Sequence, residues 1–244
     1  MIESWTAASI GMNMSMNTTK TNTPYNLTRT NRKTLSLQIR QGELIVRSPL
    51  KLPIAEIEKF IESKQSWISK SMAQSKERVA VKEAFSLNYG DSIPFRGSRY
   101  PIVAKEGNRI SFDSKCFYMP QGLNSKELQD ACIQIYKHLA KGYIPARTTE
   151  IANTLGLYPA SIKITSAKTR WGSCSNRATI NFSWRLILVP DDLSDYVIVH
   201  ELAHLKELNH STRFWSIISD IMPDYIKRQE RLKELQNQLL LENW

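Results

Sequence analysis

The chain has 244 residues, with 33 basic and 23 acidic side chains and a net charge of +10. Its content of 41% hydrophobic and 23% charged residues is ordinary for a globular protein and excludes collagen-like, mucin-like and wholly disordered chains. No run of residues approaches the roughly 18 apolar positions that a membrane-spanning helix needs. The three cysteines are too widely spaced for a disulfide framework or a zinc knuckle, so we expect a reducing compartment, the cytoplasm.

The first 34 residues differ in composition from the rest of the chain. They are rich in Asn, Thr, Met and Ser, contain almost no acids and show no sustained apolar period. They also lack the apolar stretch that a secretory signal requires after its basic start. We therefore expect residues 1–34 to form a disordered tail.

A β-hairpin and a helical segment are predicted next. Apolar and polar residues alternate over residues 35–39, and a second apolar run follows at 44–46 after the Gln41-Gly42 pair. Two short runs around a glycine-containing turn are typical of a hairpin. Pro53 then opens a pattern of helical period, which predicts helices at about residues 54–76.

The remaining elements complete an α+β fold. Glycine and proline are dense from residue 87 to 118, which predicts several short strands. Ser125 is expected to cap a long helix, and Pro145 is expected to kink or split it. The chain is thus expected to comprise a strand-rich region at 35–122 and a helix-rich region at 123–244, either separate or joined in one continuous domain.

Three of the four histidines fall within a segment of eleven residues that reads HExxH-x5-H. Residues four apart lie on one face of a helix, so His200 and His204 can present their imidazoles to a single point. A catalytic zinc site uses three protein ligands, and a turn after the helix can bring His210 to the same ion. Glu201 is placed to activate zinc-bound water as a general base. We therefore expect one Zn²⁺ per chain.

Several segments together carry a resemblance to a known family. They are KTRWGSCS at 168–175, NFSWRLILVP at 181–190, DYVIVHELAHLKELNHS at 195–211 and RFW at 213–215. The chain thereby resembles the YgjP-like metal-dependent hydrolases, zincin-type metallopeptidases related to the SprT and Wss1 families. The resemblance covers residues 35–244 and implies a zincin-like metallopeptidase core. It also implies that His200, His204 and His210 are the metal ligands and that Glu201 is the catalytic base.

Other residues are candidates for substrate binding. Either Arg170 or Tyr196 can stabilise an oxyanion, and the sequence does not choose between them. Residues 137–185 contain eight bases and one acid, a net charge of +7. Such a segment suits an acidic protein, a nucleotide or a nucleic acid, although it can also be a solvated basic face. Lys168 and Arg177 are the candidate anion-binding residues within it.

Three functions follow from these features. The leading one is a zinc metallopeptidase that cleaves a peptide or an acidic protein with the help of Glu201. The second is a metal-dependent phosphohydrolase of the nucleoside triphosphate pyrophosphatase type, with the phosphates held by Lys168, Arg170 and Arg177. The third is a nucleic-acid-binding module in which zinc is only structural. No membrane partner is expected.

Overall fold

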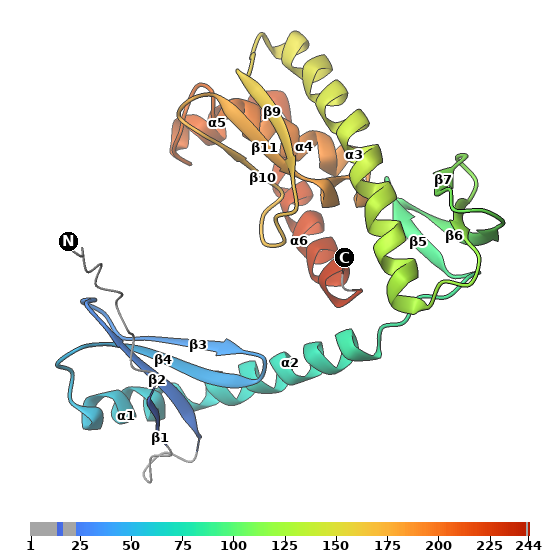
Figure 1. Cartoon of the computed structure of the whole chain (residues 1–244). Helices are drawn as coiled ribbons and strands as arrows, with labels where there is room; N and C mark the ends of the chain where they lie inside the picture. Colours follow the sequence, from blue (N-terminus) through green and yellow to red (C-terminus); the bar gives the residue numbers. More distant parts are fainter. Residues whose placement is uncertain (1–13, 17–22, 243) are drawn as a thin grey trace, which may run out of the picture. The chain divides into compact units, whose positions relative to one another are not determined.

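The computed structural model describes residues 14–16, 23–242 and 244. Its contacts divide the chain into two units, one ending at Ala84 and the other beginning at Phe85. Both units pack helices against small β-sheets (Figure 1), which confirms the predicted α+β class.

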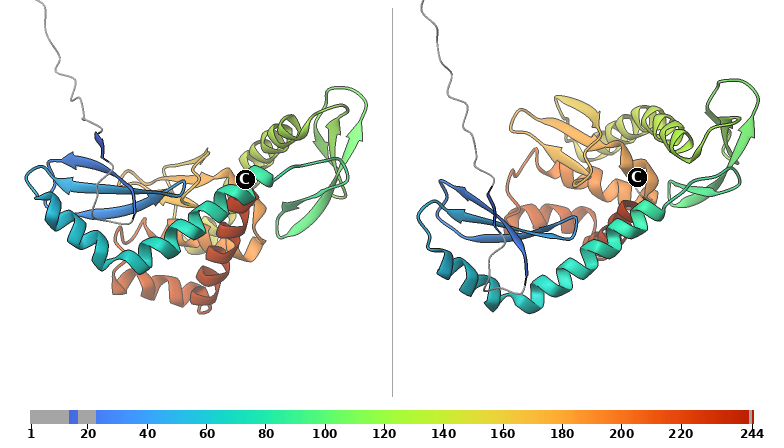
Figure 2. Two further views of the ribbon diagram at one scale, coloured as in Figure 1. Left: turned by 90° about the horizontal axis from the view of Figure 1, so that it is seen from below. Right: turned by 60° about the horizontal axis from the view of Figure 1, so that its bottom comes forward.

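The N-terminal unit contains a four-stranded sheet in the order β1-β2-β4-β3. Its strands are β1 (Met14–Met16), β2 (Tyr25–Thr30), β3 (Ser36–Arg40) and β4 (Glu43–Pro49). β3 and β4 form the predicted antiparallel hairpin, and Gln41 and Gly42 occupy its turn at positive φ. Helices α1 (Ile54–Ser63) and α2 (Gln65–Ala84) follow (Figures 1 and 2).

The core of this unit consists of alternate strand residues, two isoleucines four apart on α1 and one isoleucine of α2. This is the side-chain period that places residues on one face of a strand or of a helix. The buried members of the core are Tyr25, Leu27, Leu44, Val46, Ile57, Ile61 and Ile68.

Strand β2 lies inside the segment for which the sequence predicts a tail ending at residue 34. Residues 1–13 and 17–22 of that segment lie outside the described part of the chain. Tyr25 and Leu27 are buried, and β2 pairs in parallel with β4. Sequence analysis misses this strand because only two of its six residues are apolar and its partner β4 lies further along the chain.

The second unit begins with a sheet in the order β5-β6-β8-β7. The strands are β5 (Ser92–Phe95), β6 (Ser98–Lys105), β7 (Ser111–Phe112) and β8 (Phe117–Pro120). Figure 2 shows this sheet beside the N-terminal half of helix α3 (Ser125–Leu155). Tyr136 of α3 donates a hydrogen bond of 2.6 Å to the carbonyl oxygen of Pro94. The sequence leaves open whether the regions 35–122 and 123–244 are separate or joined, and in the structure this sheet and α3 lie in one unit.

Helix α3 begins at a capping box. The side chain of Asn124 accepts hydrogen bonds from backbone N–H groups of the first turn, and Glu127 accepts from the backbone N–H of Asn124. Ser125, which the sequence favours as the cap, accepts a hydrogen bond from the backbone of Leu87 instead. The cap is therefore one residue earlier than predicted.

Pro145 lies inside α3 and does not split it. A proline in a helix interior costs roughly 3 kcal/mol because it removes a backbone hydrogen bond and crowds the preceding turn. Ile144 and Thr148 beside it are fully buried, so packing against the core outweighs this local cost.

The rest of the second unit is a three-stranded sheet followed by helices. The sheet has the order β10-β11-β9 and consists of β9 (Ser161–Thr165), β10 (Gly172–Cys174) and β11 (Thr179–Ser183). A 3₁₀ helix (Trp184–Leu188) leads to α4 (Asp191–Ala203), α5 (Thr212–Ile221) and α6 (Tyr225–Leu241). β10 contacts α4, and β9 contacts α3. No helix among the described residues is both long and apolar enough to cross a membrane.

A substitution in β2 tests whether this strand belongs to the N-terminal core. Replacing Leu27 by Ala should lower the unfolding free energy of this unit by about 2–4 kcal/mol, because Leu27 is buried and a cavity remains. Hydrogen exchange of the β3–β4 hairpin should accelerate accordingly. The Thr30→Ala variant, at the exposed end of β2, should exchange like the wild type. Equal protection in all three proteins would contradict the assignment of β2 to the core.

Candidate metal centre

Helix α4 carries the HExxH motif and is buried on nearly all sides. Nine of its 13 residues are buried. A helix that is apolar all round is typical of a protein core rather than a surface. Its polar groups are therefore concentrated at its two ends, with three aspartates in the first two turns and the motif in the last.

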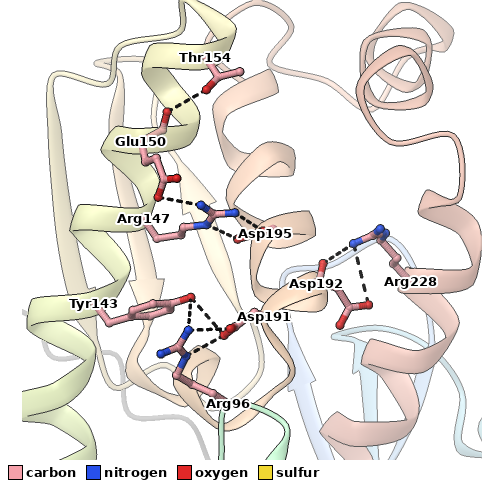
Figure 3. Close-up of polar contacts among 9 residues, drawn as sticks. All are labelled: Arg96, Tyr143, Arg147, Glu150, Thr154, Asp191, Asp192, Asp195 and Arg228. Carbon is pink, nitrogen blue, oxygen red and sulfur yellow. Dashed lines mark hydrogen bonds and ion pairs between the residues drawn. The ribbon is translucent and has the colours of Figure 1, made fainter.

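Three arginines from three other elements bind the N-terminal end of α4. Figure 3 shows the contacts, which pair Arg96 with Asp191, Arg147 with Asp195 and Arg228 with Asp192. Arg96 lies in the β5–β6 turn and makes hydrogen bonds of 2.6 and 2.8 Å to Asp191, whose pKa it lowers. Arg147 of α3 makes two bonds of 2.7 and 2.8 Å to Asp195. Each partly exposed ion pair contributes little to stability. An arginine that makes two hydrogen bonds to one carboxylate nevertheless fixes the orientation of that carboxylate.

The three motif histidines converge at the other end of α4. Their candidate ligand atoms all lie within 4.8 Å of one another. The Nε2 atoms of His200 and His210 are 3.0 Å apart. His200 lies on α4, His204 is its C-terminal cap, and His210 lies in the segment that leads to α5. The predicted turn therefore does bring His210 back to the helix.

The local environment orients the His204 ring and lowers the pKa of His200 and of His204. Nδ1 of His204 lies 3.0 Å from the carbonyl oxygen of Glu207, and because a carbonyl only accepts, Nδ1 carries the proton. Nε2 of His204 is then free to bind a metal, because a hydrogen bond from the other ring nitrogen to a carbonyl oxygen commonly orients a ligating imidazole in this way. Burial and the neighbouring histidines lower the pKa of His200 to about 3. Metal ligation requires neutral imidazoles.

Glu201 is buried beside the triad and faces strand β10. Its side chain is 6% exposed, and Oε2 has no hydrogen-bond partner among the described residues. Burial raises the pKa of Glu201 to about 7, and the charge of Arg170 opposes that shift. A Cβ atom at Gly172 would lie 2.5 Å from Oε1 of Glu201, so only glycine leaves room for this carboxylate.

An open cavity of about 300 Å³ lies next to Glu201 and His200. Trp171 and Gly172 form one wall, and Tyr196 and Val197 of α4 lie beside the motif. The remaining residues come from α6, and they are Gln229, Leu232, Lys233 and Gln236.

The candidate substrate residues are not all brought to this cavity. Tyr196 lines it, and burial raises the pKa of Tyr196 to about 12. Arg170 and Lys168 line a small adjoining cavity that shares Trp171 and Gln236 with the first. Arg177 is exposed in the turn between β10 and β11, beyond Cys174 and so away from Gly172.

The basic segment 137–185 is spread over α3 and the three-stranded sheet. Arg147 is bound by Asp195 and Glu150, and Arg185 is buried with its guanidinium over the Trp184 ring. These two bases therefore serve the fold rather than a solvated surface.

Sequence reasoning misses two groups of residues at the site. Phe214 stacks on His204, and Trp215 stacks on His210, with ring centroids 4.5 and 5.6 Å apart. His210 directly precedes Ser211, the N-cap of α5, and Trp215 is the fourth residue of this helix, so their contact has the spacing of a hydrophobic staple, which the sequence could have indicated. The α6 wall carries no motif, although Gln229, Leu232, Lys233 and Gln236 follow the spacing of one helix face.

Comparison with known proteins identifies relatives of the chain. A family model described as YgjP-like, metallopeptidase domain, matches residues 33–235, which span parts of both units. No curated protein matches significantly. Among solved structures, the metallopeptidase zymogen abylysin of Pyrococcus abyssi is 23% identical, with a TM-score of 0.35. That match covers 38% of this chain and 95% of abylysin.

Substitution of each histidine tests the candidate ligand set. His200→Ala, His204→Ala and His210→Ala should each lower the metal content of the purified protein, because each removes one of three converging nitrogen ligands. Elemental analysis of the purified variants measures this directly. His138→Ala, which changes the remaining histidine on α3, should keep the wild-type metal content. Full metal loading of His210→Ala would place the third ligand elsewhere.

Proposed function

The chain belongs to the YgjP-like metallopeptidase family, and we propose that it is a zinc-dependent peptidase in which His200, His204 and His210 hold the ion. The observation that carries this proposal is the convergence of three imidazoles beside one buried carboxylate, Glu201. The family implies a metal ion, and a set of three imidazole nitrogen ligands favours zinc. When bound, the ion supplies a Lewis acid that lowers the pKa of water and polarises a carbonyl oxygen.

Glu201 is proposed to accept the proton of the attacking water. Its position next to His200 in the sequence and in the cavity lining places its carboxylate at the edge of the triad. Its burial beside Gly172 limits the directions in which the side chain can turn. As the peptide bond breaks, the protonated Glu201 gives this proton to the nitrogen of the leaving amine, and the carboxylate is restored.

Tyr196 is the better placed of the two oxyanion candidates. It lies one helical turn before His200, with ring centroids 6.0 Å apart, and lines the same cavity. Its raised pKa keeps the hydroxyl protonated, which a hydrogen-bond donor requires. Arg170 lines the adjoining cavity instead. We therefore propose that Tyr196 stabilises the developing oxyanion and that Arg170 acts through its charge.

A second candidate function is hydrolysis of a nucleotide phosphoanhydride. Lys168 and Arg170 line the small cavity next to the proposed site, and both are exposed, so a phosphate can reach them. The same metal and the same Glu201 would serve that reaction. All three cysteines are free thiols, which supports the cytoplasm as the compartment for either activity.

Two substrates and one chelator separate these candidates. Zinc-loaded protein should degrade fluorescently labelled casein, and a chelator should stop the reaction. Release of pyrophosphate or phosphate from nucleoside triphosphates, without casein turnover, would favour the second candidate.

The Glu201→Gln variant tests the proton acceptor. The change keeps the shape of the side chain but removes the base, so turnover of casein should fall by about 10²–10⁴-fold. Metal content should stay near that of the wild type, because Glu201 is not among the converging ligands. Unchanged turnover would show that another group takes the proton. Loss of metal together with activity would make Glu201 a support of the ligand set.

The Gly172→Ala variant tests the positioning of Glu201. The added methyl group must displace the Glu201 carboxylate, and a shift of about 1 Å at a catalytic group can cost roughly 10²-fold in rate. Metal content and secondary structure should change little, because the three atoms nearest to the added methyl group all belong to Glu201. Ser173→Ala on the same strand is the matched control and should keep most of the activity. Wild-type turnover of Gly172→Ala would contradict this role.

A further inference from the structure

The cavity beside Glu201 has a wall that the ligand motif does not explain. Helix α6 contributes four residues to it, spaced at positions 229, 232, 233 and 236. Lys233 is the one charged residue among them, and Lys233 forms no ion pair within the described part of the chain. The acids Glu230 and Glu234 of α6 do not line this cavity. Apart from Glu201 itself, the lining therefore offers a positive charge and no negative one.

A second group of cations lies behind the shared wall formed by Trp171 and Gln236. Lys168, Arg170 and Arg185 line the small adjoining cavity. Arg185 is 8% exposed, its Nη1 donates to the carbonyl oxygens of Ser166 and Ala167, and its Nε has no partner. No carboxylate among the described residues pairs with these three cations. A charge that is buried without a counter-charge is costly, and here it adds to a positive potential on one side of the catalytic cavity.

We propose that this cavity selects peptide substrates with an acidic side chain next to the scissile bond and that Lys233 is the residue that recognises it. The inference rests on the proposed peptidase function and deepens it by naming the substrate class. Trp171 and Leu232 provide an apolar wall for the aliphatic part of a Glu or Asp side chain, and Gln229 and Gln236 offer amide donors. The carboxylate then meets the ammonium group of Lys233.

The amount of charge favours a carboxylate over a nucleotide. A nucleoside triphosphate carries about four negative charges, which proteins usually balance with several cations or a metal clamp. The lining of this cavity contains one cation, Lys233, and three apolar residues, whereas Lys168, Arg170 and Arg185 line the adjoining cavity behind Trp171 and Gln236. The one negative charge of a carboxylate is balanced by the one positive charge of Lys233.

Cleavage-site profiling tests the proposal. Zinc-loaded wild-type protein is incubated with a proteome-derived peptide library, and mass spectrometry identifies the residues on both sides of each cut. We expect Asp and Glu to be enriched at one position next to the cut. In Lys233→Glu this preference should reverse towards Lys and Arg. For a matched pair of peptides that differ only by Glu or Lys at that position, the ratio of kcat/KM values should change by at least about tenfold.

Two further variants complete the experiment. Lys227→Glu makes the same charge change at an exposed position of α6 that does not line the cavity, so it should keep the wild-type profile. Lys233→Ala should weaken the acidic preference without reversing it. Because Lys233 is exposed, all variants should fold like the wild type, which circular dichroism verifies.

The outcomes separate this inference from the function on which it rests. Peptide cleavage that Glu201→Gln abolishes, but without an acidic preference or with the same profile in Lys233→Glu, overturns the inference and leaves the peptidase intact. Absence of any such cleavage overturns both. Nucleoside triphosphate hydrolysis that depends on Lys233, without peptide cleavage, assigns the lysine to phosphate and also overturns the proposal.

Discussion

The burial of helix α4 determines the arrangement of the whole site. Because the helix is covered on nearly every side, its direction is set by the core around it and by the arginines that bind its first turns. The imidazoles of His200 and His204 are consequently placed by the packing of this helix. The neutral state of His200 has the same origin, since the burial that fixes the ring also disfavours its charge. A ligand set formed in this way binds an ion with little reorganisation.

The part of the site that lies on one helix follows directly from the sequence. His200, Glu201 and His204 are fixed relative to one another by helical geometry, so their spacing alone predicts that they meet. The hairpin of β3 and β4 is predictable for the same reason, because alternation and the Gln41-Gly42 turn act over a few residues. To predict His210 as the third ligand, one must also assume that the chain turns back after the helix.

Local sequence patterns do not predict features that depend on contacts between residues far apart in the sequence. Gly172 is small because Glu201, 29 positions later, occupies the space of its Cβ, and nothing near residue 172 indicates this. In the sequence, the four α6 residues that line the cavity form only an ordinary amphipathic pattern, and nothing in it indicates a cavity. Pro145 predicts a kink or break, but the helix is not split there. The proline has a local energetic cost, and the packing of the fully buried Ile144 and Thr148 outweighs it.

The three histidines differ in what must move before an ion can leave. His204 is buried and its ring is bound to the backbone of Glu207, whereas His210 is exposed on the short segment between α4 and α5. Excursions of a surface segment occur in nanoseconds to microseconds, far faster than the opening of a packed core. If the three histidines hold an ion, detachment of His210 alone would give it a route to solvent while α4 stays in place. Exchange of that ion would then depend on one connecting segment, and His200 and His204 would remain in position to bind another.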